Sequence, residues 1–203
     1  MNQDPSSASG TALPNLRTLL RGLNGLAESL LRARTRQEDV WEHALTISRL
    51  ASLGVARDDC RDVIARELLV ADGKLTASSR IVLTDAGLAV MQIAIPDGAV
   101  RPIYNIDFRE LSVVGDLILP LAVQARNLAT VLASIERADW KPRVVKPLDG
   151  SPGGNDPHHL CNAACSLNDH RSLIHFRADD GAVRWRWRTS AETTAMRRSA
   201  TSR

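Results

Sequence analysis

Leucine recurs at steps of three and four residues near the start of the chain. These positions are Leu16, Leu19, Leu20, Leu23, Leu26, Leu30 and Leu31. The spacing places them on one face of a helix, which we expect over residues 15–34. So long an apolar face needs a second surface to pack against, so this segment is also a candidate for homodimer formation or for binding a protein partner.

Two further helices are expected at short intervals. Apolar residues at helical spacing predict a helix over residues 38–53, and Gly54 is placed to end it in the left-handed conformation. The same spacing resumes over residues 58–68, where two aspartates begin the next helix. Two helices joined by a short glycine-containing turn form the helix-turn-helix arrangement.

From residue 68 onward, the spacing of apolar residues changes from one typical of a helix to one typical of strands. Residues 68–70 and 80–83 predict two strands joined through a turn. Thr84 is the expected N-cap of a short helix over residues 85–93. A cluster of turn-forming residues at positions 96–98 is the expected boundary between two domains.

The second half of the chain repeats this mixture of helices and hairpins. We expect a hairpin over residues 108–119, a helix over 123–139, an extended segment over 143–148, a helix over 157–168 and a terminal hairpin over 173–188. Short helices that alternate with hairpins, rather than with single buried strands, are typical of α+β proteins.

The predicted fold is therefore α+β, with two small winged-helix-like units in tandem, each made of helices with a β-hairpin wing. The first unit spans residues 14–96 and the second spans residues 99–189. Residues 1–13 are rich in Ser, Ala and Pro and predict a disordered arm, and residues 190–203 predict a disordered basic tail. A length of 203 residues suits one large domain or two small ones.

Motifs in both halves resemble winged-helix proteins. The first half, from WEHALTISRLASLGV to IVLTDAGLAVM, is similar to winged-helix units of bacterial regulators, in which a Leu-Thr-acidic-Ala-Gly turn follows the wing. The second half, from FRELSVVGDLIL to LIHFRADDGAVRWRW, is similar to DNA-binding domains of the response-regulator type. The span from Trp41 to Trp187 also resembles a group of uncharacterised bacterial proteins without an established activity. The resemblance implies that the helix before the last hairpin lies in a major groove.

Composition and charge narrow the class of protein. Three cysteines, an odd number, argue against a disulfide framework and favour a reducing compartment. Neither a secretory signal nor a long apolar run is present, so we expect a cytoplasmic protein without a membrane partner. The net charge of +3 is uneven, because residues 1–98 hold 11 basic and 12 acidic side chains (−1) and residues 99–203 hold 15 and 11 (+4). The basic excess of the second half permits contact with nucleic acid.

The terminal hairpin carries the best candidate site for nucleic acid. Because side chains alternate along a strand, Val183, Trp185 and Trp187 are expected in the core, and the arginines between and after them share the other face. Such a face can follow a phosphate backbone, whereas the alternative is an exposed edge strand protected by its charge. The candidate nucleic-acid-binding residues are Arg171, Arg177, Arg184, Arg186 and Arg188.

The helix over residues 157–169 favours a second class of function. It contains no Lys or Arg, although a helix that reads a groove normally carries cations. Weak or regulatory binding of double-stranded DNA through backbone phosphates is the first expectation. A protein-interaction module built on winged-helix units, without DNA binding, is the alternative.

Residues of the kind that bind zinc leave a third, metal-dependent possibility open. They are His158, His159, Cys161, Cys165, His170 and His175. No CxxC pair is present, so we expect a capped helix with incidental Cys and His and no metal site. A Gly-x-Ser-x-Gly motif, a phosphate-binding loop and a dinucleotide-binding motif are also absent, which predicts that the protein is not an enzyme and has no cofactor.

Overall fold

The computed structural model describes residues 16–94, 100–151, 154–170 and 173–201. Within these residues the fold is α+β, with seven helices and three small antiparallel sheets. The α+β class predicted from the sequence is therefore confirmed. The predicted disordered arm (residues 1–13) and the predicted domain boundary (residues 96–98) lie outside the described residues.

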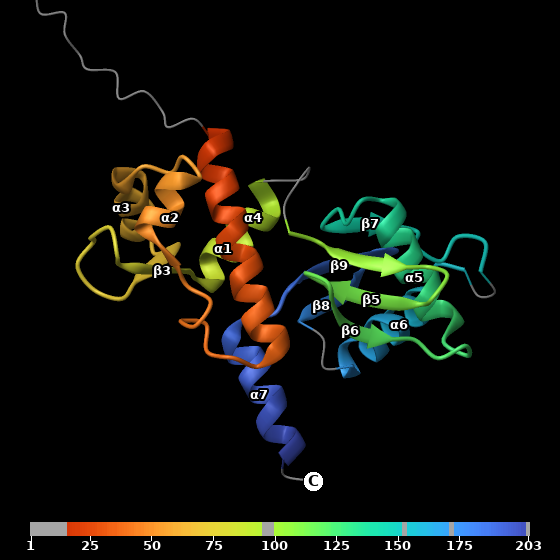
Figure 1. The fold of residues 1–203 in the computed structure, drawn as a ribbon. Helices are drawn as coiled ribbons and strands as arrows, with labels where there is room; N and C mark the ends of the chain where they lie inside the picture. The colour runs from red at the N-terminus through yellow and green to blue at the C-terminus, as the bar shows by residue number, and fades with distance from the viewer. Residues whose placement is uncertain (1–15, 95–99, 152–153, 171–172, 202–203) are drawn as a thin grey trace, which may run out of the picture.

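The amino-terminal part is a group of helices around one small sheet. Its elements are α1 (Leu16–Arg36), β1 (Leu45–Thr46), α2 (Ile47–Ser52), α3 (Arg57–Ala65), β2 (Leu69–Ala71), β3 (Arg80–Leu83) and α4 (Asp85–Ala94). The strands are antiparallel and lie in the order β1-β3-β2, with Leu45 opposite Ile81 and Leu69 opposite Leu83. The central strand β3 packs against α1, the long helix that runs through the middle of the molecule (Figure 1).

The prediction of a helix over residues 38–53 is wrong for the first half of that range. Residues 38–44 form turns, and α2 begins only at Ile47. The backbone of Leu45 and Thr46 pairs with β3 instead, and the Thr46 hydroxyl caps α2 by accepting a backbone N–H at 3.2 Å. Pairing with a strand far along the chain thus overrides the local helical spacing. The predicted end is confirmed, because Gly54 has a left-handed φ of 88° just beyond α2.

The turn from β3 into α4 carries the sequence Thr84-Asp85-Ala86-Gly87. The predicted N-cap is confirmed, since the Thr84 hydroxyl accepts the Gly87 N–H at 3.0 Å. The backbone N–H of Thr84 donates to the Leu68 carbonyl oxygen at 3.1 Å, and its hydroxyl lies 2.8 Å from the Glu67 carbonyl oxygen and 3.1 Å from that of Leu68. The first turn of α4 is therefore held tightly against the backbone that leads into β2.

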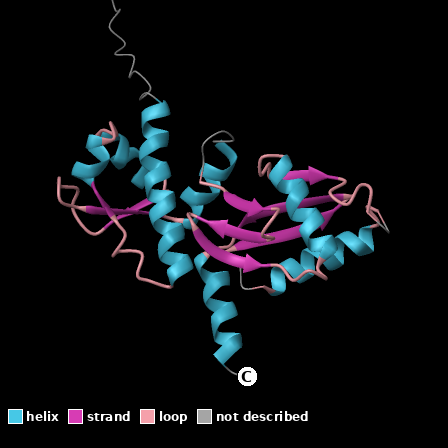
Figure 2. Cartoon of the chain, turned by 45° about the vertical axis from the view of Figure 1, so that its right-hand side comes forward, coloured by secondary structure: helices cyan, strands magenta, loops and turns pink. Residues whose placement is uncertain are grey.

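The carboxy-terminal part contains two more three-stranded sheets and two helices. Its elements are β4 (Pro102–Asn105), β5 (Glu110–Val113), β6 (Asp116–Pro120), α5 (Arg126–Arg137), β7 (Arg143–Val145), α6 (Pro157–Asp169), β8 (Ile174–Asp179) and β9 (Ala182–Trp187). The antiparallel sheets have the strand orders β4-β5-β6 and β7-β9-β8. α6 packs on β8 and on α5, and Figure 2 shows both helices beside the strands. The predicted hairpins and helices are present, and β4 is a strand that the sequence pattern does not predict.

The aromatic side chains of the terminal strand lie in the core, as predicted. Val183, Trp185 and Trp187 are buried, with at most 6% of each residue exposed. Trp185 lies edge to face between Trp140 and Trp187, with ring centroids 5.1 and 5.5 Å away. Its indole N–H donates to the Trp140 carbonyl oxygen at 3.0 Å, so the segment after α5 is fixed to β9.

The buried residues of the two parts form one continuous hydrophobic cluster. On one side, Leu26 and Leu31 of α1 are buried within this cluster. On the other side, the Gln92 side chain of α4 donates to the Trp185 carbonyl oxygen at 3.1 Å and accepts the Trp187 N–H at 3.4 Å. The apolar face of α1, predicted as a candidate dimerisation surface, is therefore covered by the chain itself from Leu26 onward.

Within the predicted disordered tail (residues 190–203), the described residues form helix α7 (Ser190–Thr201), so the prediction is wrong for them. A capping box begins the helix. The Thr189 hydroxyl accepts the Glu192 N–H at 3.2 Å, and the Glu192 carboxylate accepts the Thr189 N–H at 2.9 Å. Figure 1 shows α7 leading away from the body of the molecule near the end of α1.

We expect Glu192→Ala to lower the free energy of unfolding by about 1 kcal/mol at neutral pH, the usual cost of losing a helix cap. A hydrogen-bonded pair with Arg186 holds the pKa of Glu192 at about 2, below the value of about 4.3 in an unfolded chain. A lowered carboxyl pKa stabilises the fold above the unfolded pKa, and this contribution is lost as the pH falls through the folded pKa.

The difference in unfolding free energy between the wild type and Glu192→Ala should therefore shrink as the pH falls from about 4.5 to about 2. Urea denaturation at several pH values measures it. Glu28→Ala, which removes an exposed carboxylate from α1, is the control. A difference for Glu192→Ala that stays constant over this range would contradict the ion-paired capping box.

Candidate nucleic-acid interface

Three arginines lie in register across the sheet β7-β9-β8. Arg184 on β9 lies opposite both Arg143 on β7 and Arg177 on β8. Residues directly opposite on neighbouring antiparallel strands point to the same face, with Cβ atoms about 4.5–5.5 Å apart. We call Arg143, Arg177 and Arg184 the cross-strand arginine row.

The cross-strand arginine row faces solvent. All three residues are exposed, and the residues on either side of Arg184 are buried, so the row occupies the face of β9 away from the core. The Arg184 guanidinium forms an ion pair with Asp179 at 2.9 Å. Arg143 and Arg177 have no side-chain hydrogen bond or ion pair with any residue that the structure describes. Two uncompensated guanidinium groups therefore flank a compensated one.

Sequence reasoning missed Arg143 as a member of the site. The expectation that residues 143–148 are extended is confirmed for β7, but the pattern does not reveal which strand pairs with this segment. The local signal is an exposed Arg143 followed by a buried Val144, a two-residue alternation too short to be specific. Arg143 joins the row only through its pairing with β9.

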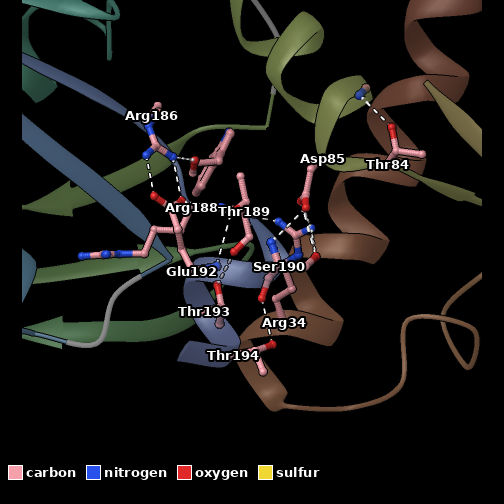
Figure 3. Close-up of polar contacts among 12 residues, drawn as sticks. Arg34, Thr84, Asp85, Arg186, Arg188, Thr189, Ser190, Glu192, Thr193 and Thr194 are labelled. Atoms are coloured by element: carbon pink, nitrogen blue, oxygen red, sulfur yellow. Dashed lines mark hydrogen bonds and ion pairs between the residues drawn. The ribbon is translucent and has the colours of Figure 1, made fainter. Parts of the chain in front are cut away.

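Arg186, predicted on the same face as Arg184, is held by α7. Its guanidinium donates two hydrogen bonds to the Glu192 carboxylate, at 2.6 and 2.8 Å (Figure 3). This carboxylate raises the pKa of Arg186. The pair joins β9 to the first turn of α7. The Arg186 guanidinium therefore stabilises the fold and has its charge compensated by Glu192.

Arg188 is buried, so the prediction that it shares an exposed face with Arg184 is wrong. It follows the last residue of β9, where the alternation of the strand no longer determines its direction. Its guanidinium donates to the carbonyl oxygens of Ile174 and Asn168 at 3.2 and 3.1 Å. Burial lowers the pKa of Arg188. The remaining candidate, Arg171, lies outside the described residues.

Helix α6 presents no Lys or Arg side chain to solvent. Its exposed residues include His158, His159, Cys161, Asn162, Cys165 and Asp169. Asp156 caps the helix, because its carboxylate accepts the His158 N–H at 2.7 Å. His175, on β8 opposite Arg186, has a pKa lowered by burial and by nearby arginines, so its imidazole is neutral at neutral pH and adds no charge to the sheet face.

Comparisons of the chain with protein-family models, with curated proteins and with solved structures give no match. In the described ranges, no helix is long and apolar enough to cross a membrane. Nor does any group of three or more His, Cys, Asp or Glu residues gather there as metal ligands. The sheet β7-β9-β8 therefore has a cationic face on which two guanidinium groups, those of Arg143 and Arg177, lack an acidic partner among the described residues. Such a face is suited to binding anions.

Proposed function

We propose that this chain is a DNA-binding protein of two winged-helix units, which contacts backbone phosphates through the cross-strand arginine row. The order of the elements supports the architecture. The series α1-β1-α2-α3-β2-β3 carries a sheet of order β1-β3-β2, and the series α5-β7-α6-β8-β9 carries a sheet of order β7-β9-β8. In both series the first strand pairs with the last, and the final hairpin occupies the position of a wing.

The arginine row is the observation that carries the proposal. Like charges directly opposite on neighbouring strands destabilise a sheet. Asp179 is the one acidic partner that the described residues supply to the row, so an external polyanion would relieve the remaining repulsion. A DNA duplex carries about one phosphate charge per 1.7 Å of its axis, and guanidinium groups bind phosphate oxygens in pairs of hydrogen bonds.

Two observations favour the second candidate function, a protein-interaction module. The exposed face of α6 lacks Lys and Arg, which weakens base reading by this helix. Phe108 and Val123 are 73% and 75% exposed, although both are apolar. These features limit the DNA proposal to backbone contact that is independent of sequence, and they identify the alternative if duplex binding is not observed.

Fluorescence anisotropy with a labelled duplex of random sequence tests the proposal at about 50 and about 200 mM salt, a range over which phosphate binding weakens steeply. We expect the wild type to bind at the lower concentration. The triple variant Arg143→Gln, Arg177→Gln and Arg184→Gln should bind at least about tenfold more weakly. Its plot of log affinity against log salt should be shallower by about 3, close to one unit per phosphate contact.

A control variant distinguishes the contribution of the arginine row to DNA binding from the contribution of the overall net charge. Arg49→Gln, Arg57→Gln and Arg66→Gln remove three exposed cations from the amino-terminal part, and they lower the net charge by the same amount. Equal losses in the two variants would show that net charge alone binds DNA and would exclude the row as the site. Absence of binding by the wild type at the lower salt would refute DNA binding and favour the protein-interaction module.

A further inference from the structure

Two exposed thiols lie one helical turn apart on α6. Cys161 and Cys165 are four residues apart, a spacing that places them on one face of the helix with Cβ atoms about 5–6 Å apart. The two thiols share a hydrogen bond. Cysteine is among the residue types most often buried, as Cys60 is in this chain, so two exposed thiols side by side are unusual. The buried face of α6 is formed by other residues, namely Leu160, Ala163, Ala164 and Leu167.

A disulfide does not fit the spacing of this pair. The Cβ atoms of a disulfide lie about 3.5–4.5 Å apart, whereas a helix holds the Cβ atoms of residues four apart at about 5–6 Å. Closing the gap would require α6 to unwind, although this helix is capped by Asp156 and packs on β8 and α5. Cys161 and Cys165 therefore remain two free thiols while α6 is intact.

The surroundings of the pair do not activate a thiolate as a nucleophile. A reactive cysteine has a lowered pKa, which a nearby cation or a helix N-terminus provides. α6 contains no Lys or Arg, and both cysteines lie beyond its first turn. The hydrogen bond with Cys161 and the Asp169 carboxylate raise the pKa of Cys165. The same surroundings favour a bound cation, because Asp169 attracts a positive charge placed between the two sulfurs.

We propose that Cys161 and Cys165 bind one soft monovalent metal ion of the class of Cu(I), which bridges their two sulfurs. Each thiol releases its proton to solvent as its sulfur binds the ion, and no electron is transferred. Soft thiolate ligands favour Cu(I), and monovalent ions of this class accept two ligands in a nearly linear arrangement. With metal–sulfur bonds of about 2.3 Å, as in zinc thiolates, such a bridge spans up to about 4.6 Å between the sulfurs. Two side chains one turn apart can reach this separation.

Zinc fits the pair less well than Cu(I). A structural zinc site takes four protein ligands, and a catalytic site takes three and a water molecule. Among the described residues, no group of three or more His, Cys, Asp or Glu side chains gathers to hold a metal. The number of ligands on α6 therefore selects an ion that is satisfied by two thiolates.

Competition with the coloured Cu(I) complex of bicinchoninate, in the absence of oxygen, tests the proposal. The wild type should withdraw one Cu(I) per chain. Loss of an outer partner of a metal ligand costs about 10–100-fold in affinity, so loss of a ligand itself in Cys161→Ser or Cys165→Ser should cost at least about a hundredfold. Cu(I) should also raise the melting temperature of the wild type, because it binds the folded helix, and it should not raise that of either variant.

Two control variants separate the paired thiols from thiols in general. His159→Cys combined with Cys161→Ser keeps two exposed thiols on α6 but places them six residues apart, on different faces of the helix. This variant should bind Cu(I) as weakly as Cys161→Ser. Asn162→Ser changes an exposed neighbour of Cys161 and should bind Cu(I) like the wild type. All these variants retain the buried Cys60, so its thiol cannot account for a difference between them.

Three outcomes would overturn the proposal. The wild type could fail to withdraw Cu(I) from bicinchoninate, Zn(II) could displace Cu(I) from the protein, or the variant with misplaced thiols could bind Cu(I) as tightly as the wild type. The last result would mean that any exposed thiol on this helix binds the ion and that the spacing of the pair is irrelevant.

This site is independent of the proposed DNA interface. α6 packs on the core side of the sheet β7-β9-β8, whereas the cross-strand arginine row faces solvent on the other side. The triple variant of the arginine row should therefore bind Cu(I) like the wild type. Failure of duplex binding would leave the expected Cu(I) result unchanged.

Discussion

Replacing Arg34 by alanine is expected to lower the free energy of unfolding by about 3 kcal/mol. Its buried guanidinium bridges three segments, as Figure 3 shows. It forms an ion pair with Asp85 at the beginning of α4, and it donates to the Arg188 carbonyl oxygen at 3.1 Å and to the Ser190 hydroxyl at 2.8 Å. Asp85 in turn accepts the Ser190 N–H at 2.9 Å. The alanine variant leaves these acceptors and the Asp85 charge without their shared donor.

The expected loss is at the low end of the range for a buried ion pair, because the Asp85 side chain is 34% exposed and water can solvate it in part. Thermal unfolding should show a fall in melting temperature of about 6–12 °C for a chain of this size. Arg34→Lys should recover only part of the stability, since a single ammonium group cannot reproduce the planar fork of the guanidinium.

Arg36→Ala is the matched control for Arg34→Ala. Arg36 lies two residues further along α1 and pairs with Asp116 at 3.2 Å, but its side chain is 48% exposed. Exposed ion pairs contribute little to stability, so this variant should melt within experimental error of the wild type. Equal effects of Arg34→Ala and Arg36→Ala would contradict the buried bridge between α1, α4 and α7.

Much of the local structure could be predicted from the sequence. The leucine spacing predicted α1, the Thr84 cap predicted the start of α4, and strand alternation predicted the buried Trp185 and Trp187. Each of these features depends on residues that are close in the chain. The capping box from Thr189 to Glu192 was equally local, so the helical start of α7 could have been recognised instead of a disordered tail.

The candidate interface could be predicted only in part, because its geometry depends on contacts between distant segments. Arg177 and Arg184 were identified from the last hairpin alone. Arg143 required the pairing of β7 with β9, two strands that lie far apart in the sequence. Arg186 does lie on the exposed face, but alternation cannot reveal the Glu192 carboxylate that pairs with it. Nor can it reveal the carbonyl oxygens that hold Arg188 in a buried position. The pattern of charged residues thus identified β9 as a candidate strand. Contacts with distant segments determine which of the arginines remain free to bind a ligand.

Gly87→Ala is expected to destabilise the fold by about 3 kcal/mol, as overpacking in a rigid site does. An added Cβ would clash with the Leu68 carbonyl oxygen and lie 2.7 Å from the Leu83 Cδ1 atom. A backbone oxygen cannot rotate away as a side chain can. Relief would require α4 to move from the strand, which would stretch the hydrogen bond from the Thr84 N–H to the same oxygen and the contacts of the Thr84 hydroxyl with the carbonyl oxygens of Glu67 and Leu68. This close approach gives a physical reason for glycine at the end of the Thr-Asp-Ala-Gly sequence.

Gly25→Ala provides a control of opposite sign. A Cβ at this position of α1 would lie 3.4 Å from the Leu45 Cδ1 atom and 3.9 Å from the Leu53 Cδ1 atom, which is ordinary contact distance. Alanine is favoured over glycine inside a helix by up to about 1 kcal/mol, so the variant should be as stable as the wild type or more stable. Urea denaturation of both variants measures the two free energies. If Gly87→Ala is as stable as Gly25→Ala, α4 does not pack against Leu68 as closely as the structure shows, because both substitutions add the same methyl group to a helix and differ in what that group meets.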